Sequence, residues 1–196
     1  IPALPIFVDS PLAVSATEVF RLHPECFNAD VYEHLFDRDN PFGFEGLRLV
    51  RDVNESKRIN QLDQSAVIIS ASGMCESGRI LHHLRNNIEK PETTILFVGY
   101  CAEHTLGAKL RAGAKTANIL GGVFRVRARI EFIDSYSGHA DHGELLAYFR
   151  RITGPKKQIF LVHGEPEGAQ ALRDALVKDH PSGQVTVARL HQSVTL

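Results

Sequence analysis

The sequence predicts an α/β fold with a mostly parallel, Rossmann-like sheet, and three observations support this fold class. Short apolar runs alternate with helical patterns along the chain, which is typical of parallel strands joined by crossover helices. The run 158–162 is almost continuously apolar, as expected for a strand buried on both faces. Hydrophobic residues make up 43% and charged residues 23% of the 196 residues, and this balance excludes a disordered chain.

The first half of the chain shows the clearest alternation. Proline at position 11 suits the first turn of a helix and Ser10 can cap that helix, so a helix is expected over 11–22. A loop rich in Asn, Pro, Phe and Gly separates the apolar run 31–36 from the next strand. The expected strands are 6–8, 47–50, 66–70 and 94–98, and the later helices are 55–62, 77–88 and 105–112.

The pattern changes after residue 112. Two short apolar pieces, 118–120 and 123–126, are separated by glycines and predict a hairpin instead of another crossover. We expect a boundary between two lobes near Arg127. Beyond it the expected order is strand 129–133, helix 141–151, strand 157–163, helix 167–178 and strand 184–190.

Two histidines stand where expected strands end. His139 follows the strand 129–133, and His163 ends the strand 157–163 just before a glycine that permits a sharp exit. The carboxyl ends of strands in open α/β sheets face the crevice in which ligands bind, so both imidazoles are expected to meet one ligand. The alternative is that both are ordinary turn or capping histidines that hydrogen-bond to the backbone.

Two strand-to-helix loops, 70–78 and 99–105, are rich in small residues, which let backbone N–H groups approach a phosphate. Glycine and serine also suit tight turns, so either loop alone is equally explained by turn formation. Neither contains a Walker loop or the dinucleotide fingerprint GxGxxG. Together with the loop that carries His139, the loops and the two histidines favour an anionic ligand in a shared cleft.

Hydrolysis of a phosphodiester would use two such histidines, one to bind a metal that activates water and one to protonate the leaving oxygen. A two-metal centre needs several His and Asp ligands, and the HxHxDH cluster that often supplies them is absent from this sequence. The metal site is therefore incomplete here. The scattered histidines are interpreted as surface or core residues: His23, His34, His82, His83, His180 and His191.

The formal net charge of −1 excludes a protein that coats nucleic acid by bulk charge. The densest basic stretch, 125–129, carries three alternating arginines, which suit either a nucleic-acid patch or the solvent-facing side of a strand.

Three widely spaced cysteines predict neither a disulfide framework nor a thiolate zinc site, and they indicate a reducing cytoplasm. No apolar run is long enough to span a bilayer, so no membrane partner is expected.

Five motifs occur in the order found in one family. The sequence resembles the later part of a β-CASP metallo-β-lactamase ribonuclease, the group that includes the endonuclease of cleavage and polyadenylation specificity factor and its bacterial and archaeal relatives. The resemblance runs nearly end to end. The motifs are FVDSPLA at 7–13, SASGM at 70–74, VGYCAEHTLG at 98–107, SGHAD at 137–141 and VHGE at 162–165.

The resemblance implies a zinc-dependent ribonuclease that hydrolyses RNA phosphodiester bonds, by endonucleolytic cutting or by trimming. It implies that residues 1–127 are the β-CASP lobe, which gives RNA specificity, and that 128–196 are the C-terminal segment of the metallo-β-lactamase domain. His139 matches a histidine taken as proton donor or phosphate partner, and His163 matches a ligand of one of two zinc ions. Loops facing the RNA phosphates would carry Ser72, Gly73, Ser137 and Gly138.

The resemblance also implies parts that this sequence lacks. The HxHxDH cluster, the later His and Asp ligands and the acidic partner of His139 are expected upstream of Ile1, and Asp9 is not that acidic residue. This chain, which opens without methionine, is therefore expected to be a piece of a larger protein, with at most a partial zinc site and no activity alone. His104 stands where the family usually carries glycine, which puts the backbone freedom of that loop in doubt.

The expected partners are RNA and the missing N-terminal half of the metallo-β-lactamase domain. Without that half, the strand ending at His163 is expected to expose apolar surface, which favours self-association, with a homodimer as one form. Two other functions stay open: a noncatalytic RNA-binding module of the same family, and a phosphate- or nucleotide-binding α/β domain unrelated to RNA.

Overall fold

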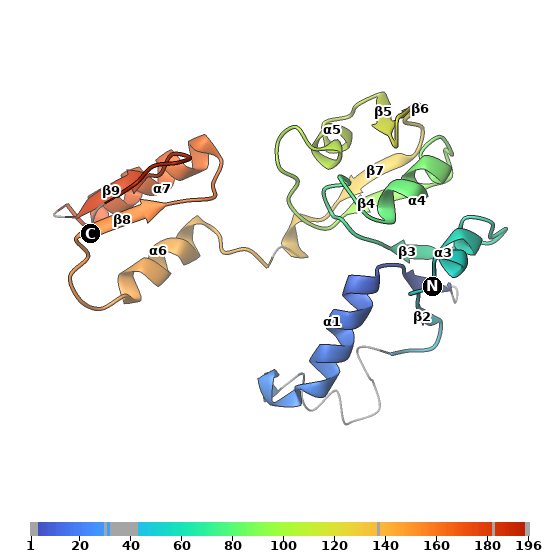
Figure 1. The fold of residues 1–196 in the computed structure, drawn as a ribbon, viewed down its shortest axis with the longest axis horizontal. Coiled ribbons are helices and arrows are strands. Elements are labelled where there is room, and N and C mark those ends of the chain that lie inside the picture. The colour runs from blue at the N-terminus through green and yellow to red at the C-terminus, as the bar shows by residue number, and fades with distance from the viewer. Residues whose placement is uncertain (1–3, 30, 32–42, 137, 182, 195–196) are drawn as a thin grey trace. The chain divides into compact units, whose positions relative to one another are not determined.

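The computed structural model of the protein describes residues 4–29, 31, 43–136, 138–181 and 183–194. The chain forms two compact units, Ile1–Ser137 and Gly138–Leu196, and Figure 1 shows the elements of each. Parallel strands alternate with helices in both units, which confirms the predicted α/β class. The apolar run predicted at 31–36 lies outside the described residues except for its first position.

A three-stranded parallel sheet begins the first unit. The strand β1 (Ile6–Val8) lies between β2 (Leu47–Leu49) and β3 (Val67–Ile69), in the order β2-β1-β3. Phe7 is buried against Val50, which follows β2, and this contact forms the centre of a small core. The carboxyl ends of the three strands therefore lie at one edge of the sheet, as parallel pairing requires.

The helix α1 (Pro11–Leu22) begins and ends where the sequence predicts. Proline occupies its first turn, and the Ser10 side chain accepts a hydrogen bond from the backbone N–H of Ala13 at 3.3 Å. This cap places the start of α1 directly after the end of β1. The short helix α3 (Val53–Ile59) is capped in the same way, because the Asp52 carboxylate accepts from two backbone N–H groups of its first turn.

The rest of the first unit is built around a second pair of parallel strands. The strand β4 (Thr94–Phe97) follows helix α4 (Ile80–Asn87) and pairs with β7 (Arg129–Phe132). The larger core of this unit joins α4, β4 and helix α5 (Leu106–Arg111). Its buried residues are Cys75, Leu84, Ile88, Phe97, Cys101, Leu106, Leu110, Ala117 and Ile119.

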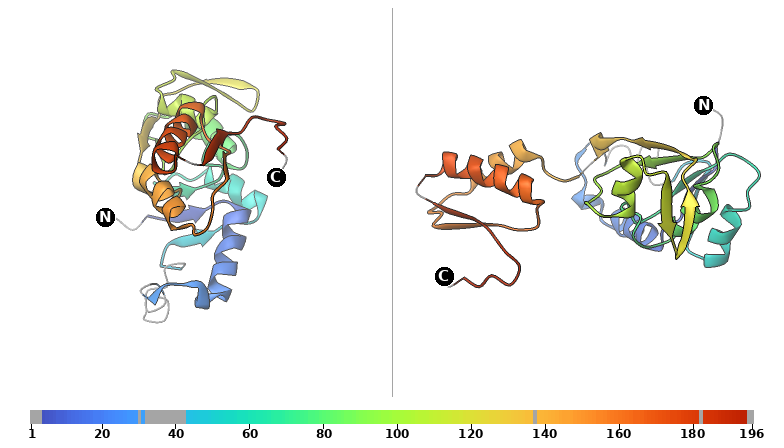
Figure 2. Two further views of the ribbon diagram at one scale, coloured as in Figure 1. Left: turned by 90° about the vertical axis from the view of Figure 1, so that its left-hand side faces the viewer. Right: turned by 90° about the horizontal axis from the view of Figure 1, so that it is seen from above.

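The predicted hairpin is present. The strands β5 (Thr116–Ile119) and β6 (Gly122–Arg125) pair antiparallel, and both residues of the turn, Leu120 and Gly121, have positive φ. Two positive φ values in a two-residue turn match the twist of the flanking strands. Figure 2 shows the hairpin in yellow-green, and β5 packs against α4 and α5.

The described part of the second unit contains two helices and two strands. The strand β8 (Gln158–Leu161) pairs in parallel with β9 (Gln184–Val187), and α7 (Pro166–Asp179) makes the crossover between them. The helix α6 (His142–Arg151) packs against α7. The first compact unit extends to residue 137 because β7 pairs with β4 and so belongs to that unit. The assignment of residues 1–127 and 128–196 to two family domains stays a prediction.

One expectation about the second unit is wrong. The apolar run ending at His163 was expected to be buried on both faces, yet β8 is only half-buried and Val162 is 72% exposed. The reason is that, in the described part of this unit, β8 pairs with β9 alone, so its sheet is too small to enclose it. The exposed Val162 agrees with the separate prediction that the strand ending at His163 exposes apolar surface.

Candidate functional site

The loop 70–79 leaves the end of β3 and enters α4, and main-chain hydrogen bonds close it on itself. The N–H of Ser72 donates to the carbonyl of Ser77 at 3.1 Å, and the N–H of Ile80 donates to the carbonyl of Ala71 at 3.2 Å. Gly78 has φ +83°, and a Cβ there would lie 2.4 Å from the Ala71 oxygen. Only glycine fits this position, so the loop has a defined path.

A second loop, 99–105, docks onto the first. The N–H of Gly107 donates to the carbonyl of Met74 at 2.9 Å, and the Glu76 carboxylate accepts from the N–H of Leu106 at 2.5 Å. The Cys101 thiol contacts the Gly73 carbonyl at 3.6 Å. The structure therefore brings together two of the three loops that the sequence places around a shared cleft.

Ser72 and Gly73 lie on this pair of loops. Ser72 is half-buried and its hydroxyl oxygen accepts from the N–H of Glu76 at 3.3 Å. Gly73 is exposed, and a Cβ built there would meet nothing within 4 Å. Open space beside Gly73 suits the approach of a ligand to its backbone, and the assignment of both residues to RNA binding stays a prediction.

The backbone at His104 has a conformation that favours glycine. Its φ is +69°, which is the left-handed region that residues with a Cβ seldom adopt. The next residue, Thr105, caps α5 by accepting from the N–H of Ala108 at 3.2 Å. The backbone turn at His104 is thus the step that brings the loop into α5.

The two predicted site histidines both lie in the second unit and are exposed. Only Val162 separates His163 from the end of β8, and the φ of +64° at His163 turns the chain sharply there before α7. His139 precedes α6, whose start is fixed by a capping box: Asp141 accepts from the N–H of Glu144 at 2.8 Å, and Glu144 accepts from the N–H of Asp141 at 2.9 Å. Their catalytic and metal-binding roles stay predictions.

Two further predicted site residues, Ser137 and Gly138, precede His139 in the motif SGHAD. Gly138 is exposed, with open space where a Cβ would lie. Ser137 lies outside the described residues. The described residues contain no group of three His, Cys, Asp or Glu side chains that could hold a metal ion. His163 by itself does not fit a zinc centre, because such a centre takes three or four protein ligands.

A buried polar network around Asp9 was not identified from the sequence. The Asp9 side chain is fully buried and accepts from the Ser56 hydroxyl at 2.6 Å, from Nε2 of His83 at 2.6 Å and from the Arg79 guanidinium. Burial alone would raise the pKa of Asp9, but the hydrogen bonds from Ser56, His83 and Arg79 outweigh it and lower the pKa. The carboxylate is therefore ionised in the core.

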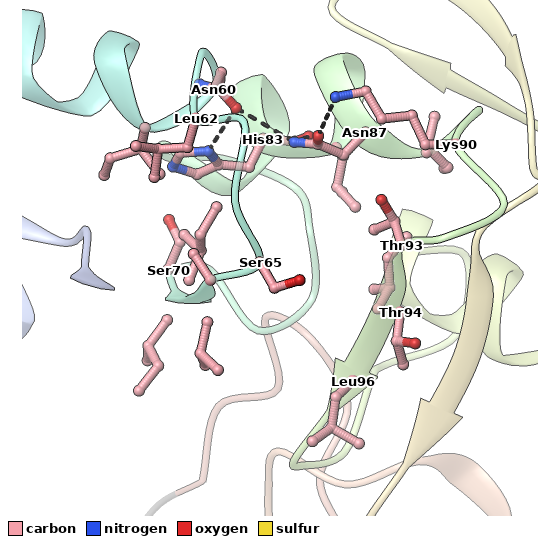
Figure 3. A pocket seen from close by; sticks show the side chains of 18 of the residues that line it. Asn60, Leu62, Ser65, Ser70, His83, Asn87, Lys90, Thr93, Thr94 and Leu96 are labelled. Atoms are coloured by element: carbon pink, nitrogen blue, oxygen red, sulfur yellow. Dashed lines mark hydrogen bonds between the residues drawn. The ribbon is translucent and has the colours of Figure 1, made fainter. Parts of the chain in front are cut away.

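The network continues into the polar wall of a cavity. Nδ1 of His83 faces the Asn60 amide oxygen at 3.0 Å, and Asn87 donates to the same oxygen at 3.3 Å, as Figure 3 shows. The cavity measures about 850 Å³ and is lined by the segment 59–70, by α4 and by β4 with the residues before it, and about half of the lining residues are aliphatic. Lys90 is the one Lys or Arg among its described lining residues, so this cavity does not suit a phosphate backbone.

The arginines of the basic stretch 125–129 and two of the scattered histidines can be placed in the structure. Arg125, Arg127 and Arg129 are all exposed and alternate with half-buried or buried residues, which leaves both interpretations of the stretch open. His83 is a core residue, and His82 is exposed. Within the described ranges, every helix is too short or too polar to cross a membrane.

Two family models match this chain in sequence order. The first is described as the Beta-Casp domain and matches residues 1–110. The second is described as the Zn-dependent metallo-hydrolase RNA specificity domain and matches residues 123–187.

Similar proteins come from bacteria and archaea. Ribonuclease TTHA0252 of Thermus thermophilus is 33% identical over 194 residues, which cover 99% of this chain and 44% of that protein. Transcription termination factor FttA of Methanosarcina mazei is 28% identical over 184 residues, covering 91% of this chain and 29% of that protein. FttA of Methanocaldococcus jannaschii is 31% identical over 167 residues, covering 82% and 26%. The chain thus spans less than half the length of these relatives.

Proposed function

We propose that the full-length protein containing this chain is a zinc-dependent ribonuclease, because the chain belongs to the Beta-Casp family of RNA-processing nucleases. The observation that carries the proposal is the ordered match of both family models across one chain, with His139 and His163 inside the second matched range. The similar protein named a ribonuclease supports hydrolysis of RNA, and the metallo-hydrolase description supports zinc.

In this proposal each unit has its own task. The docked loops 70–79 and 99–105 bind the RNA backbone through Ser72 and Gly73, and Ser137 and Gly138 add further phosphate contacts. Hydrogen bonds to phosphate hold the strand without reading its sequence. His139 donates a proton to the leaving oxygen or holds the phosphate beside the scissile bond.

His163 is proposed as one metal ligand of the full-length protein. Since the described residues lack a complete ligand set, this chain alone is expected to hold no stable zinc ion and to be inactive. The N-terminal half of the metallo-β-lactamase domain is the partner that would complete the site. Three free cysteines fit a reducing compartment, and we place the protein in the cytoplasm.

The test compares the full-length protein with residues 1–196 of this chain. We expect about two zinc ions per full-length chain by metal analysis, and cleavage of a labelled single-stranded RNA by that form alone. His139→Ala in the full-length protein should abolish cleavage while RNA binding and zinc content persist. Glu167→Gln, at an exposed position of α7 outside the five motifs, is the matched control in the same unit.

The outcomes separate the rival functions. RNA binding without zinc or cleavage in either form would replace the nuclease with a noncatalytic RNA-binding module. Competition by mononucleotides at the same concentration as an RNA oligomer would instead indicate a nucleotide-binding domain.

A further inference from the structure

We infer that Asp9 is a positioning residue that fixes both stems of the loop 70–79. This inference rests on the proposed function, because it concerns the loop that is proposed to bind RNA phosphates. Asp9 itself is fully buried and does not reach a ligand. It acts through the residues at which the loop leaves β3 and enters α4.

The first stem is Ser70, which follows β3. The Ser70 hydroxyl donates to the main-chain carbonyl of Asp9 at 2.9 Å. One residue earlier, the N–H of Asp9 donates to the carbonyl of Ile69 at 2.8 Å. The end of β1 and the start of the loop are therefore joined by a main-chain and a side-chain bond at the same residue.

The second stem is Arg79, which precedes α4. Its Nη1 donates to the Asp9 carboxylate and to the carbonyl of Val50 at 3.2 Å, and Nη2 donates to the carbonyl of Arg51. The Arg79 side chain is 15% exposed and the Asp9 side chain 0% exposed. A buried, charge-assisted bond of this kind has little freedom to shift, because a displaced charge would lose its partners.

The orientation of the Asp9 carboxylate is also fixed. One oxygen, Oδ1, faces Arg79, while Oδ2 accepts from Ser56 and from His83. His83 faces an oxygen with each ring nitrogen, since Nδ1 lies 3.0 Å from the Asn60 amide oxygen. The contact between Nε2 of His83 and Oδ2 holds that oxygen, and this leaves Oδ1 directed at Arg79.

The two stems enclose the residues that are proposed to meet RNA. Ser72 and Gly73 lie between Ser70 and Arg79, and the N–H of Ile80 closes the loop on Ala71. Loss of the Asp9 charge would release Arg79 and let the α4 side of the loop shift relative to β3. A displacement of about 1 Å at a positioning contact can reduce activity up to a hundredfold.

The experiment uses the full-length protein with Asp9→Asn and Arg79→Gln. The asparagine keeps the size and one acceptor oxygen of the side chain but loses its charge. Ser56→Ala is the matched control, because it removes one bond to Oδ2 of Asp9 while His83 still holds that oxygen and Arg79 keeps its bond to Oδ1. The readouts are KM and kcat for a labelled single-stranded RNA, and hydrolysis of bis(4-nitrophenyl) phosphate, which is too small to span the loop.

We expect Asp9→Asn and Arg79→Gln to raise KM for RNA on the order of tenfold, with kcat and hydrolysis of the small diester nearly unchanged. Arg79→Lys should recover part of the loss because it restores the charge. Ser56→Ala should lower the melting temperature without changing KM. Unchanged KM in both stem variants, or an equal rise in Ser56→Ala, would overturn the inference.

Two further results keep the test decisive. If Asp9→Asn does not fold, Ser70→Ala removes only the hydroxyl bond of the first stem, and an unchanged KM in that variant overturns the inference. If the wild-type protein neither cleaves nor binds RNA, the proposed function fails and the inference fails with it. Wild-type cleavage with unchanged KM in the variants rejects the inference alone.

Discussion

The backbone N–H of Gly107 donates to the carbonyl of Met74 at 2.9 Å and joins two loops that lie far apart in the sequence. The approach is close because a Cβ at Gly107 would lie 2.8 Å from the Cys101 sulfur and 3.0 Å from the Met74 oxygen. Such a contact admits no side chain without moving one of the loops.

Gly107→Ala should destabilise the full-length protein by about 1–3 kcal/mol, since the added methyl group overpacks the contact between the loops. Gly99→Ala, in the loop that leads into α5, is the control, because its Cβ would meet nothing within 4 Å. Thermal unfolding measures both. A melting temperature of Gly107→Ala equal to that of Gly99→Ala would contradict the packing that we describe.

His104 offers a test of backbone strain. Because its φ is +69°, His104→Gly should stabilise the loop by up to about 1 kcal/mol, whereas the β-branched His104→Val should destabilise it by about 1–2 kcal/mol. Melting temperatures of the two variants give the comparison. The prediction fails if valine is tolerated as well as glycine.

The Asp9 network predicts a loss of stability in acid. The pKa of Asp9 lies below its ordinary value of 3.8 in the folded protein, so its stabilising effect is present above that value and is lost as the pH falls through the folded pKa. The melting temperature of the wild type should therefore exceed that of Asp9→Asn at neutral pH, and the two should converge in strong acid. A constant difference over the whole range would refute this assignment.

Removal of the carboxylate should be costly. Asp9→Ala leaves Arg79 and His83 without their shared acceptor in the core, and breaking a buried ion pair in this way costs about 3–5 kcal/mol. Urea unfolding measures the loss. Asp141→Ala, which removes an exposed helix cap in the second unit, should cost only about 1 kcal/mol and serves as the comparison.

The cysteines should differ in reactivity. Burial, together with the nearby Cys101 and Glu76, raises the pKa of the Cys75 thiol to about 12, whereas Cys26 is exposed. The thiolate is the reactive form, so iodoacetamide should modify Cys26 in the folded protein and Cys75 only after denaturation. Peptide mass spectrometry reads this order directly, and early modification of Cys75 would disprove its burial.

The parts of the fold that depend on neighbouring residues could be predicted from the sequence. The helix after Ser10 and Pro11, the hairpin at Gly121 and the helix start at Asp141 are each determined by a few adjacent residues, and the structure confirms all three. The exposure of Val162 could not be derived in the same way. Burial depends on how many strands join the sheet, which the apolar run itself does not contain.

The candidate site shows the same division. Its loops could be predicted because small residues follow apolar strands. The contact between the loops could not be derived from a shared sheet edge, because β3 and β4 belong to separate sheets in the described part of the chain, and it rests on the bond from the N–H of Gly107 to the carbonyl of Met74. The Asp9 network could not be predicted from the sequence, because its partners Ser56 and His83 lie 47 and 74 residues away from Asp9. An aspartate at the end of an apolar strand, together with a buried-face histidine in a later helix, is the signal that could have indicated it.

The main-chain closure of the loop 70–79 separates its path from its side chains. Ala71, Gly78 and Gly107 define that path through backbone contacts, whereas Met74 and Ser77 are exposed and use only their main-chain carbonyl groups in the contacts that hold the loop. Substitutions at these two exposed positions can alter what the loop presents while the scaffold beneath stays constant. Under the proposed function, this arrangement lets related chains vary the surface that meets RNA without rebuilding the fold.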